Sequence, residues 1–326
     1  MAGETGGLMG RFRDRIWICA LALWLVCAAG GGWAAPGASF VMDARTGQVY
    51  AAENADARRH PASLTKMMTL YLAFAAVERG RLAMEDVVRI SARAALEPGS
   101  RLGLRAGERV TVRDLITATA VRSANDAATA LAEAVAGSET AFVTRMNDAA
   151  RRMGLRNTRF RNAHGLTAEG HYSTARDMSL LGRQLALDFP QFFELFRQRK
   201  AQAAGREILH TNRRFLGAYA GADGIKTGYT SAAGYNLTAS ARRGRKWLIV
   251  TVMGAGSSAE RSARVSRLMD AGFAKAPERA KPMPPRSAPR PLLADRAPLF
   301  TAAANDAVTD ASPPRGAGSV GVFALR

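Results

Sequence analysis

The chain has very little cysteine. Its only two cysteines, Cys19 and Cys27, both fall in the N-terminal segment, so the rest of the sequence has no thiol. Disulfide bonds and thiol chemistry are therefore excluded from the body of the protein. Aromatic residues are also sparse, at 7% of the 326 residues, although an apolar content of 48% is sufficient for a well-buried core.

Lysine is scarce as well, because the 46 basic residues comprise 40 arginines and only 6 lysines. Against 27 acidic residues they give a net charge of +19, which favours either an anionic partner or a solvated basic surface. The sequence has no zinc-finger spacing, no RNA-binding signature and no dense run of basic residues. We therefore expect no nucleic-acid partner.

The N-terminal residues have the composition of an export signal. Arginines at positions 11, 13 and 15 precede the apolar run 16–29, and small residues follow, with Gly32-Trp33-Ala34 as a suitable cleavage site. This order predicts a secretory signal peptide over residues 1–34. An uncleaved anchor is the alternative, since with the glycines and Trp33 the run approaches the roughly 20 residues that span a bilayer. We expect an exported, periplasmic protein that contacts the membrane only through this segment.

Proline is concentrated at the other end of the chain. Nine of the thirteen prolines follow residue 275, and no hydrophobic period is sustained there. The composition predicts a disordered or loosely extended tail over residues 275–326, without the amphipathic helix that would lie on a membrane. Residues 36–274 remain as one continuous body.

The body is predicted to have strands at both ends and helices between them. An N-terminal β-hairpin is expected from 39–43 and 48–52. Three further strands are expected at 222–228, 235–242 and 247–253. Helices are expected at 63–78, 112–120, 126–136, 139–153, 174–186, 190–196 and 260–273. This order predicts an α+β fold, in which an antiparallel β-sheet completed by both chain ends is flanked by helices and carries an all-helical insert.

The first predicted helix opens with Ser63-Leu-Thr-Lys66. Residues three apart share one helix face, so the Ser63 hydroxyl and the Lys66 amine are expected within hydrogen-bonding reach. Backbone N–H groups at the helix start would favour negative charge that develops near Ser63. Lys66 can act as a base only if it is neutral, which requires burial and a second nearby cation to lower its pKa. Taken alone, the pair is more often an N-cap serine beside a solvated lysine.

Two further triplets follow. Ser123-Ala-Asn125 lies between two predicted helices, where Ser123 could pass a proton and Asn125 could hold Lys66; a loop with a helix cap is the alternative. Lys226-Thr-Gly228 ends a predicted strand and, on a sheet edge, would offer a cation, a hydroxyl and a close backbone approach; a strand-end turn is the alternative. Lysine at 66 and 226 is informative in an arginine-rich chain, because arginine cannot be deprotonated to serve as a base.

Ser-x-x-Lys, Ser-x-Asn and Lys-Thr-Gly in this order are a signature of penicillin-binding proteins and class A β-lactamases. The sequence resembles the low-molecular-mass penicillin-binding proteins, the family of serine D-Ala-D-Ala carboxypeptidases. The likeness covers residues 38–274 and includes further segments of that family's pattern. These are Asn162-Ala-His164-Gly-Leu166, 173–178 (STARDM), 224–228 (GIKTG), 233–237 (AGYNL) and 252–254 (VMG).

The resemblance implies a serine peptidase that works through an acyl-enzyme. Ser63 would attack the carbonyl between two D-alanines, and Lys66 would take its proton. Ser123 would help to return a proton to the leaving amine, while Asn125 would orient Lys66 and the acyl group. The oxyanion would lie on the backbone N–H groups of Ser63 and Tyr229.

The resemblance also implies how a substrate is held. Lys226, Thr227 and Gly228 would bind the terminal carboxylate beside Tyr229, with Arg261 on the last helix as an additional positive group. The implied substrates are peptidoglycan stem peptides ending in D-Ala-D-Ala, and β-lactam antibiotics would be covalent inhibitors. No cofactor and no metal are implied.

Several alternatives stay open. The nearest is an endopeptidase that cuts cross-links, because carboxypeptidases of this family usually carry a β-rich domain and an amphipathic anchor, for which we expect no counterpart here. A serine β-lactamase would need a glutamate-positioned water, and Glu169 is the only acidic residue in 157–176. A Ser-His-Asp hydrolase would need a Gly-x-Ser-x-Gly elbow, which is missing.

Two less favoured interpretations complete the set. A zinc site built from His164, Glu169 and His171 lacks a recognised ligand spacing, and His164 and His171 are expected to have loop or surface roles. A non-enzymatic module that binds the cell wall would need neither the serine nor the lysine of the first motif.

Overall fold

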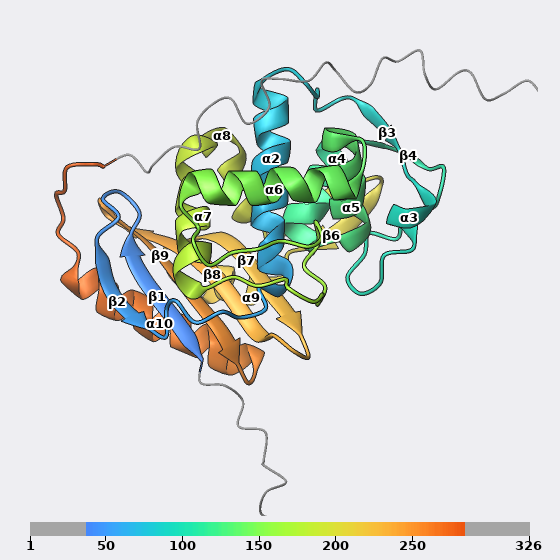
Figure 1. Cartoon of the computed structure of the whole chain (residues 1–326). Coiled ribbons are helices and arrows are strands. Elements are labelled where there is room, and N and C mark those ends of the chain that lie inside the picture. Colours follow the sequence, from blue (N-terminus) through green and yellow to red (C-terminus); the bar gives the residue numbers. More distant parts are fainter. Residues whose placement is uncertain (1–36, 284–326) are drawn as a thin grey trace, which may run out of the picture.

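The computed structural model describes residues 37–283 of the chain. Its centre is a five-stranded antiparallel sheet in the order β2-β1-β9-β8-β7 (Figure 1). The strands are β1 (Ala38–Asp43), β2 (Val49–Glu53), β7 (Ala222–Thr230), β8 (Gly234–Arg243) and β9 (Lys246–Ala255). The hairpin and the three later strands predicted from the sequence therefore form a single sheet, which confirms the α+β class.

Helices cover both faces of this sheet. Helix α7 (Ala175–Asp188) packs on one face, where Ile249 of β9 belongs to the larger apolar cluster. Helix α10 (Ser258–Lys275) packs on the other face, against Leu248 and Val250 of β9 (Figure 1). Because both faces are covered, β9 is a nearly continuous buried strand instead of an alternating one.

The region between β2 and β7 is largely helical. Its longer helices are α2 (Lys66–Glu78), α5 (Asn125–Ala136) and α6 (Glu139–Met153), and its shorter ones are α3 (Ala92–Ala95), α4 (Val112–Thr117), α8 (Pro190–Phe193) and α9 (Arg213–Ala218). Helix α2 is buried from Lys66 to Ala76, so it is a central helix that is apolar on every side. This burial places the start of α2, and with it the first motif, inside the molecule.

The prediction of an all-helical insert was wrong in one respect. Two small two-stranded antiparallel sheets lie within it: β3 (Val87–Arg89) with β4 (Arg109–Thr111), and β5 (Lys200–Ala203) with β6 (Arg206–Leu209). Strands of three or four residues carry too little alternation to be recognised from the sequence. Their formation depends on the neighbouring helices, since a two-stranded hairpin is marginal alone.

Helix ends agree with local capping signals. The prediction of 139–153 is confirmed as α6, which begins after Ser138, whose side chain accepts a hydrogen bond from the Ala141 N–H, and ends at Gly154 with a φ of 76°. The predicted helix 112–120 instead ends at Thr117 and continues as a π-helical turn, Ala118–Arg122. The predicted helix 63–78 starts as a 3-10 turn, Ala62–Thr65 (η1), before α2. Both irregular turns contain or adjoin motif residues.

The start of the predicted tail remains attached to the body. Helix α10 ends at Lys275, and Arg45 then donates hydrogen bonds to the carbonyl groups of Pro277 and Glu278. The Met283 N–H also donates to the Arg45 carbonyl at 2.9 Å. The predicted signal peptide and the tail from residue 284 onward lie outside the described residues. Within residues 37–283, no helix combines the length and apolarity needed to cross a bilayer.

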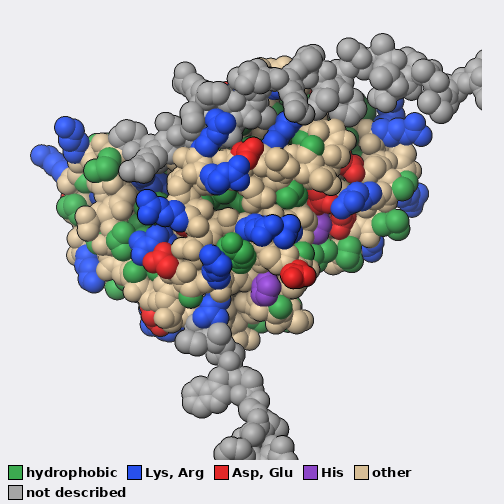
Figure 2. Space-filling model, in the orientation of Figure 1, with side chains coloured by type: hydrophobic (Ala, Val, Ile, Leu, Met, Phe, Trp, Pro, Cys, Tyr) green, Lys and Arg blue, Asp and Glu red, His purple; other side chains and the backbone are tan. Residues whose placement is uncertain are grey.

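The basic charge is spread over the surface. Figure 2 shows Lys and Arg side chains distributed across one face, with acidic side chains between them. Many arginines form ion pairs or lie over aromatic rings, such as Arg176 with Asp56 at 2.7 Å and Arg242 at 3.7 Å above the Trp247 ring. The face that is visible therefore has no single continuous basic patch.

Candidate active site

Ser63 lies in a strained turn at the base of α2. It is in the 3-10 turn η1, and the preceding Ala62 has a φ of 48°, a conformation that non-glycine residues rarely adopt. Gly165 lies directly against this turn, because a Cβ on Gly165 would be only 1.9 Å from the Ala62 carbonyl oxygen. The turn is therefore held in place by its surroundings.

Lys66 is fully buried and bound on three sides. Its Nζ is 3.1 Å from the Ser63 hydroxyl, 2.6 Å from Asn125 Oδ1 and 2.6 Å from the His164 carbonyl oxygen. Burial lowers its pKa well below the usual value, and the charge of Lys226 lowers it further. In its neutral form this amine would use its two N–H bonds for the two closer acceptors, and its lone pair would then be available to the hydroxyl of Ser63.

The second motif is placed by the π-helical turn and α5. Asn125 is the first residue of α5, and its Nδ2 donates to the Pro98 carbonyl at 2.6 Å, which fixes its oxygen toward Lys66. Ser123 is buried and, with a φ of 64°, has the left-handed conformation at the end of that turn. The neighbouring Asp126 carboxylate accepts three backbone N–H bonds from residues 102–104, which anchors the start of α5.

The third motif lies inside β7, the edge strand that faces η1, and not at the strand's end as predicted. Gly228 is needed there, because a Cβ at this position would be 3.0 Å from both the Ser63 nitrogen and the Pro61 carbonyl oxygen. Lys226 is buried, and burial followed by the charge of Arg261 lowers its pKa to about 7. The Thr227 hydroxyl donates to the Thr211 hydroxyl at 2.8 Å.

The remaining two predicted residues flank this strand. Tyr229 is 53% exposed and its ring packs against Tyr235 with centroids 4.4 Å apart. Arg261 is buried in the first turn of α10, where one Nη donates to the Ser258 hydroxyl at 3.0 Å. Ser63, Lys66 and Asn125 are thus in direct contact. Lys226 and Arg261 lie near enough for their charges to act on neighbouring groups, since Lys226 lowers the pKa of Lys66 and Arg261 lowers that of Lys226.

The loop 162–166 supplies a contact to Lys66 that the sequence did not predict. The His164 carbonyl binds Lys66, and the loop is held by the Thr69 hydroxyl, which donates to the Ala163 carbonyl at 2.6 Å. The Asn162 side chain accepts the Gly165 N–H at 2.6 Å. A backbone carbonyl has no sequence signature, so the sequence identified this loop only as part of the family resemblance and gave its carbonyl no role.

His164 was predicted to have a loop or surface role, and the surface part was wrong because its side chain is buried. Its Nδ1 accepts the Leu166 N–H at 3.2 Å, so the ring proton lies on Nε2, between the Glu97 and Glu139 carboxylates at 3.3 and 3.5 Å. Burial and the charge of Lys66 lower the pKa of His164 to about 3. His171 is also buried and its pKa is lowered to about 4, chiefly by burial.

Glu97, Glu139 and His164 form the one group within residues 37–283 whose spacing could hold a metal ion, although no metal was expected. Both carboxylates already have other partners: the Thr129 hydroxyl donates to Glu97, and the Ala163 N–H donates to Glu139. The cluster therefore serves to support the loop that binds Lys66. The zinc site considered with Glu169 is not formed, since Glu169 is exposed and not part of this group.

Comparison with known proteins agrees with this geometry. A family model described as D-alanyl-D-alanine carboxypeptidase matches residues 33–257. Among curated relatives, D-alanyl-D-alanine carboxypeptidase DacF of Bacillus subtilis is 39% identical over 239 residues, and DacA of Escherichia coli K12 is 40% identical over 239 residues. Each alignment covers 72% of this chain, but only 61% and 59% of those relatives' lengths.

Solved structures give the same assignment. Penicillin-binding protein 5 from Haemophilus influenzae matches with a TM-score of 0.70 and 36% identity, covering 73% of this chain and 70% of that one. Penicillin-binding protein D2 from Listeria monocytogenes, in its ampicillin-bound form, matches with a TM-score of 0.67 and 32% identity, covering 72% and 96%. The motifs, the fold and the identities agree, and the chain belongs to the D-alanyl-D-alanine carboxypeptidase family of serine peptidases, peptidase family S11.

Proposed function

We propose that this chain is a serine D-Ala-D-Ala carboxypeptidase that trims peptidoglycan stem peptides and is acylated by β-lactams. The observation that carries the proposal is the environment of Lys66: a buried amine with a lowered pKa, two acceptors for its N–H bonds, and a serine hydroxyl 3.1 Å away. This is the arrangement of a general base beside its nucleophile.

In the proposed acylation, Ser63 loses its proton to Lys66 and attacks the carbonyl carbon between the two D-alanines. The oxyanion is stabilised by the backbone N–H groups of Ser63 and Tyr229. The close approach of Gly228 to the Ser63 nitrogen supports this, because it brings the backbone of β7 next to the backbone of Ser63. Lys66 then returns the proton through Ser123 to the leaving amine. Water hydrolyses the acyl-enzyme by the reverse sequence.

The terminal carboxylate of the substrate is proposed to bind Lys226, Thr227 and Arg261. Burial is the main cause of the lowered pKa of Lys226, and repulsion by the charge of Arg261 lowers it further. A carboxylate placed between them would relieve this repulsion and form charge-assisted hydrogen bonds. Substrate binding is therefore expected to raise the pKa of Lys226.

Two alternatives use the same residues. An endopeptidase would accept a larger leaving group than a single D-alanine. The chain spans only about three fifths of the length of the carboxypeptidases that it matches, so its preference for a carboxypeptidase substrate is part of the proposal. A β-lactamase would need a carboxylate that positions the deacylating water. Glu169 is exposed, and Glu97 and Glu139 are engaged around His164, so slow release of bound penicillin is the expected behaviour.

We also propose that the protein is exported and acts in the periplasm. Residues 1–34 have the composition of a signal peptide. The substrate class requires access to the cell wall, and the cysteine-free body needs no disulfide formation after export.

The test is covalent labelling of the full chain with a fluorescent penicillin. Ser63→Ala and Lys66→Ala are expected to abolish labelling, whereas Ser231→Ala and Lys200→Ala, at exposed positions, should label as the wild type does. A pentapeptide ending in D-Ala-D-Ala and a cross-linked dimer are then compared as substrates. Undiminished labelling of either active-site variant would contradict the assignment.

A further inference from the structure

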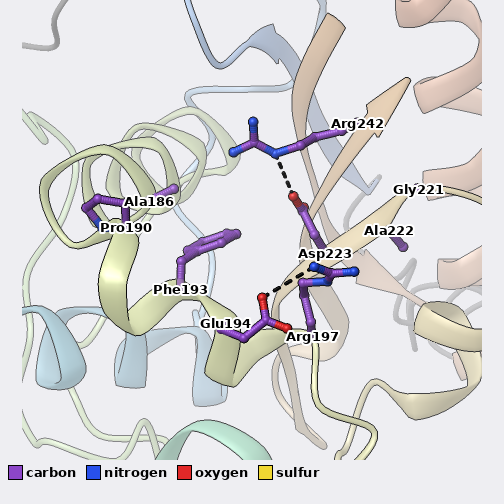
Figure 3. Close-up of a pocket in the computed structure, with 9 residues that line it drawn as sticks. All are labelled: Ala186, Pro190, Phe193, Glu194, Arg197, Gly221, Ala222, Asp223 and Arg242. Atoms are coloured by element: carbon purple, nitrogen blue, oxygen red, sulfur yellow. Dashed lines mark hydrogen bonds and ion pairs between the residues drawn. The ribbon is translucent and has the colours of Figure 1, made fainter. Parts of the chain in front are cut away.

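The described part of the chain has several surface hollows, and their charges differ. One of about 440 Å³ lies at the start of β7, beside α8 (Figure 3). Its charged side chains pair with one another: Asp223 with Arg242 at 3.0 Å, and Glu194 with Arg197 at 3.3 Å. A hollow whose charges are already paired gives little attraction for a charged ligand.

A second hollow, of about 450 Å³, is the groove between α9 and α10. The buried rings of Phe215 and Tyr219, stacked with centroids 5.4 Å apart, line it, and the exposed side chains of Arg213 and Arg214 also border it. None of the 13 residues that line this groove, all within residues 37–283, is acidic. The groove is therefore positively charged and suited to an anionic group.

Two buried polar groups of the groove have no hydrogen-bond partner. Asn212 is 2% exposed, and neither its Nδ2 nor its Oδ1 is paired. The Nε of Arg261, a residue 7% exposed, is also unpaired. Leaving a buried polar group without a hydrogen bond destabilises the protein, so these groups are expected to be satisfied by a ligand or by water. Both belong to side chains that border the groove.

The groove is continuous with the proposed carboxylate subsite. Arg261 belongs to both, since it borders the groove and lowers the pKa of Lys226. Thr211, also in the groove lining, accepts the hydroxyl hydrogen bond of Thr227 at 2.8 Å. The groove therefore begins where the carboxylate of the leaving residue would be bound, on the leaving-group side of the cleaved bond.

We infer that the groove between α9 and α10 binds a leaving group that carries a carboxylate in addition to its α-carboxylate, as the second peptide of a cross-link does. The inference rests on the proposed function and specifies the substrate class of that site. Arg213 and Arg214 supply the attracting charge, and Asn212 and Arg261 supply hydrogen-bond donors. A D-alanine leaving group, whose side chain is a methyl group, would leave the groove to solvent.

The test uses the full chain and three N-acylated peptides that end in D-Ala-D-Ala, D-Ala-D-Glu and D-Ala-D-Gln. The last two peptides differ only in the side chain of the final residue, which is a carboxylate in D-Glu and the corresponding amide in D-Gln. The wild type is expected to cleave the D-Glu peptide about tenfold faster than the D-Gln peptide in kcat/KM, the effect of about one hydrogen bond to a charged group. The double variant R213E/R214E is expected to reduce that ratio to one or below.

Arg267→Glu is the matched control, because Arg267 is an exposed arginine of α10 that does not line the groove. It should keep the wild-type ratio. A wild-type ratio of one, or a ratio that the double variant leaves unchanged, would overturn the inference while cleavage of the D-Ala-D-Ala peptide continued to support the proposed function. Failure to cleave any of the three peptides would overturn both.

Discussion

Replacing the buried lysine of the third motif should stabilise the protein while it removes activity. Lys226 is fully buried, and its pKa is about 7 in the folded chain against 10.5 for an exposed lysine. The unfolded chain therefore binds more protons than the folded chain between these two pH values. The free energy of unfolding therefore rises with pH between about 7 and 10.5 through this residue, and burial of Lys226 destabilises the folded chain most below pH 7.

The magnitude follows from the size of the shift. At about 1.36 kcal/mol per pKa unit, burial of Lys226 costs about 5 kcal/mol at pH 6 and about 2 kcal/mol at pH 9. Lys226→Met keeps a similar volume and removes this cost, although it also loses the 3.2 Å hydrogen bond from Nζ to the Thr227 carbonyl. The advantage of the variant should therefore shrink by about 3 kcal/mol between pH 6 and pH 9. Relief of repulsion on Lys66 acts in the same direction.

The assay is reversible urea unfolding of both proteins at pH 6, 7.5 and 9, with free energies of unfolding taken from linear extrapolation. Lys200→Met is the control, because Lys200 is exposed and its replacement should change stability by less than about 0.5 kcal/mol at every pH. Lys226→Met should also lose most cleavage of a D-Ala-D-Ala peptide. A variant that is less stable at pH 6, or whose advantage is independent of pH, would refute the reasoning.

Three further outcomes are expected. Arg261→Met removes a positive charge that lowers the pKa of Lys226, so Lys226 should keep its proton to a higher pH. The pH above which substrate binding is lost, measured as the rise of KM with pH, should therefore increase. Gly228→Ala should reduce the rate of penicillin acylation at least about tenfold, because its Cβ would lie 3.0 Å from the Ser63 nitrogen; unchanged acylation would contradict that packing. Gly165→Ala should lower the free energy of unfolding by about 3 kcal/mol or more, measured by urea, since its Cβ would overlap the backbone of η1 and its φ is +93°.

The polar surroundings of the loop 162–166 connect stability with function. His164 carries a neutral ring between two carboxylates, and its backbone carbonyl accepts one N–H of Lys66. Because the Glu139 carboxylate also binds the Ala163 N–H, the position of that carbonyl depends on a buried acid at the start of helix α6. Lys66 thus owes its orientation to helix α6 as well as to its own helix.

Local sequence patterns were sufficient for much of the fold. The hairpin β1–β2, the strands β7 to β9 and helix α6 could be predicted because alternation, turn residues and caps act within a few residues of each other. The strand pairs β3–β4 and β5–β6 could not be predicted, because strands this short are stabilised by contacts with distant helices. The π-helical turn before Ser123 also has no signal of its own.

The sequence by itself determined which side chains are available: a serine and a lysine three residues apart, a Ser-x-Asn triplet, and a Lys-Thr-Gly strand in an otherwise arginine-rich chain. It could not determine that Lys66 is buried and that its pKa is lowered, first by this burial and then by the charge of Lys226, which is 160 residues away in the chain but close in space. The same holds for the His164 carbonyl and for the groove between α9 and α10. The sequence specifies the residue types, whereas burial, charge repulsion and unpaired hydrogen-bond donors arise only when segments that are distant in the chain pack together.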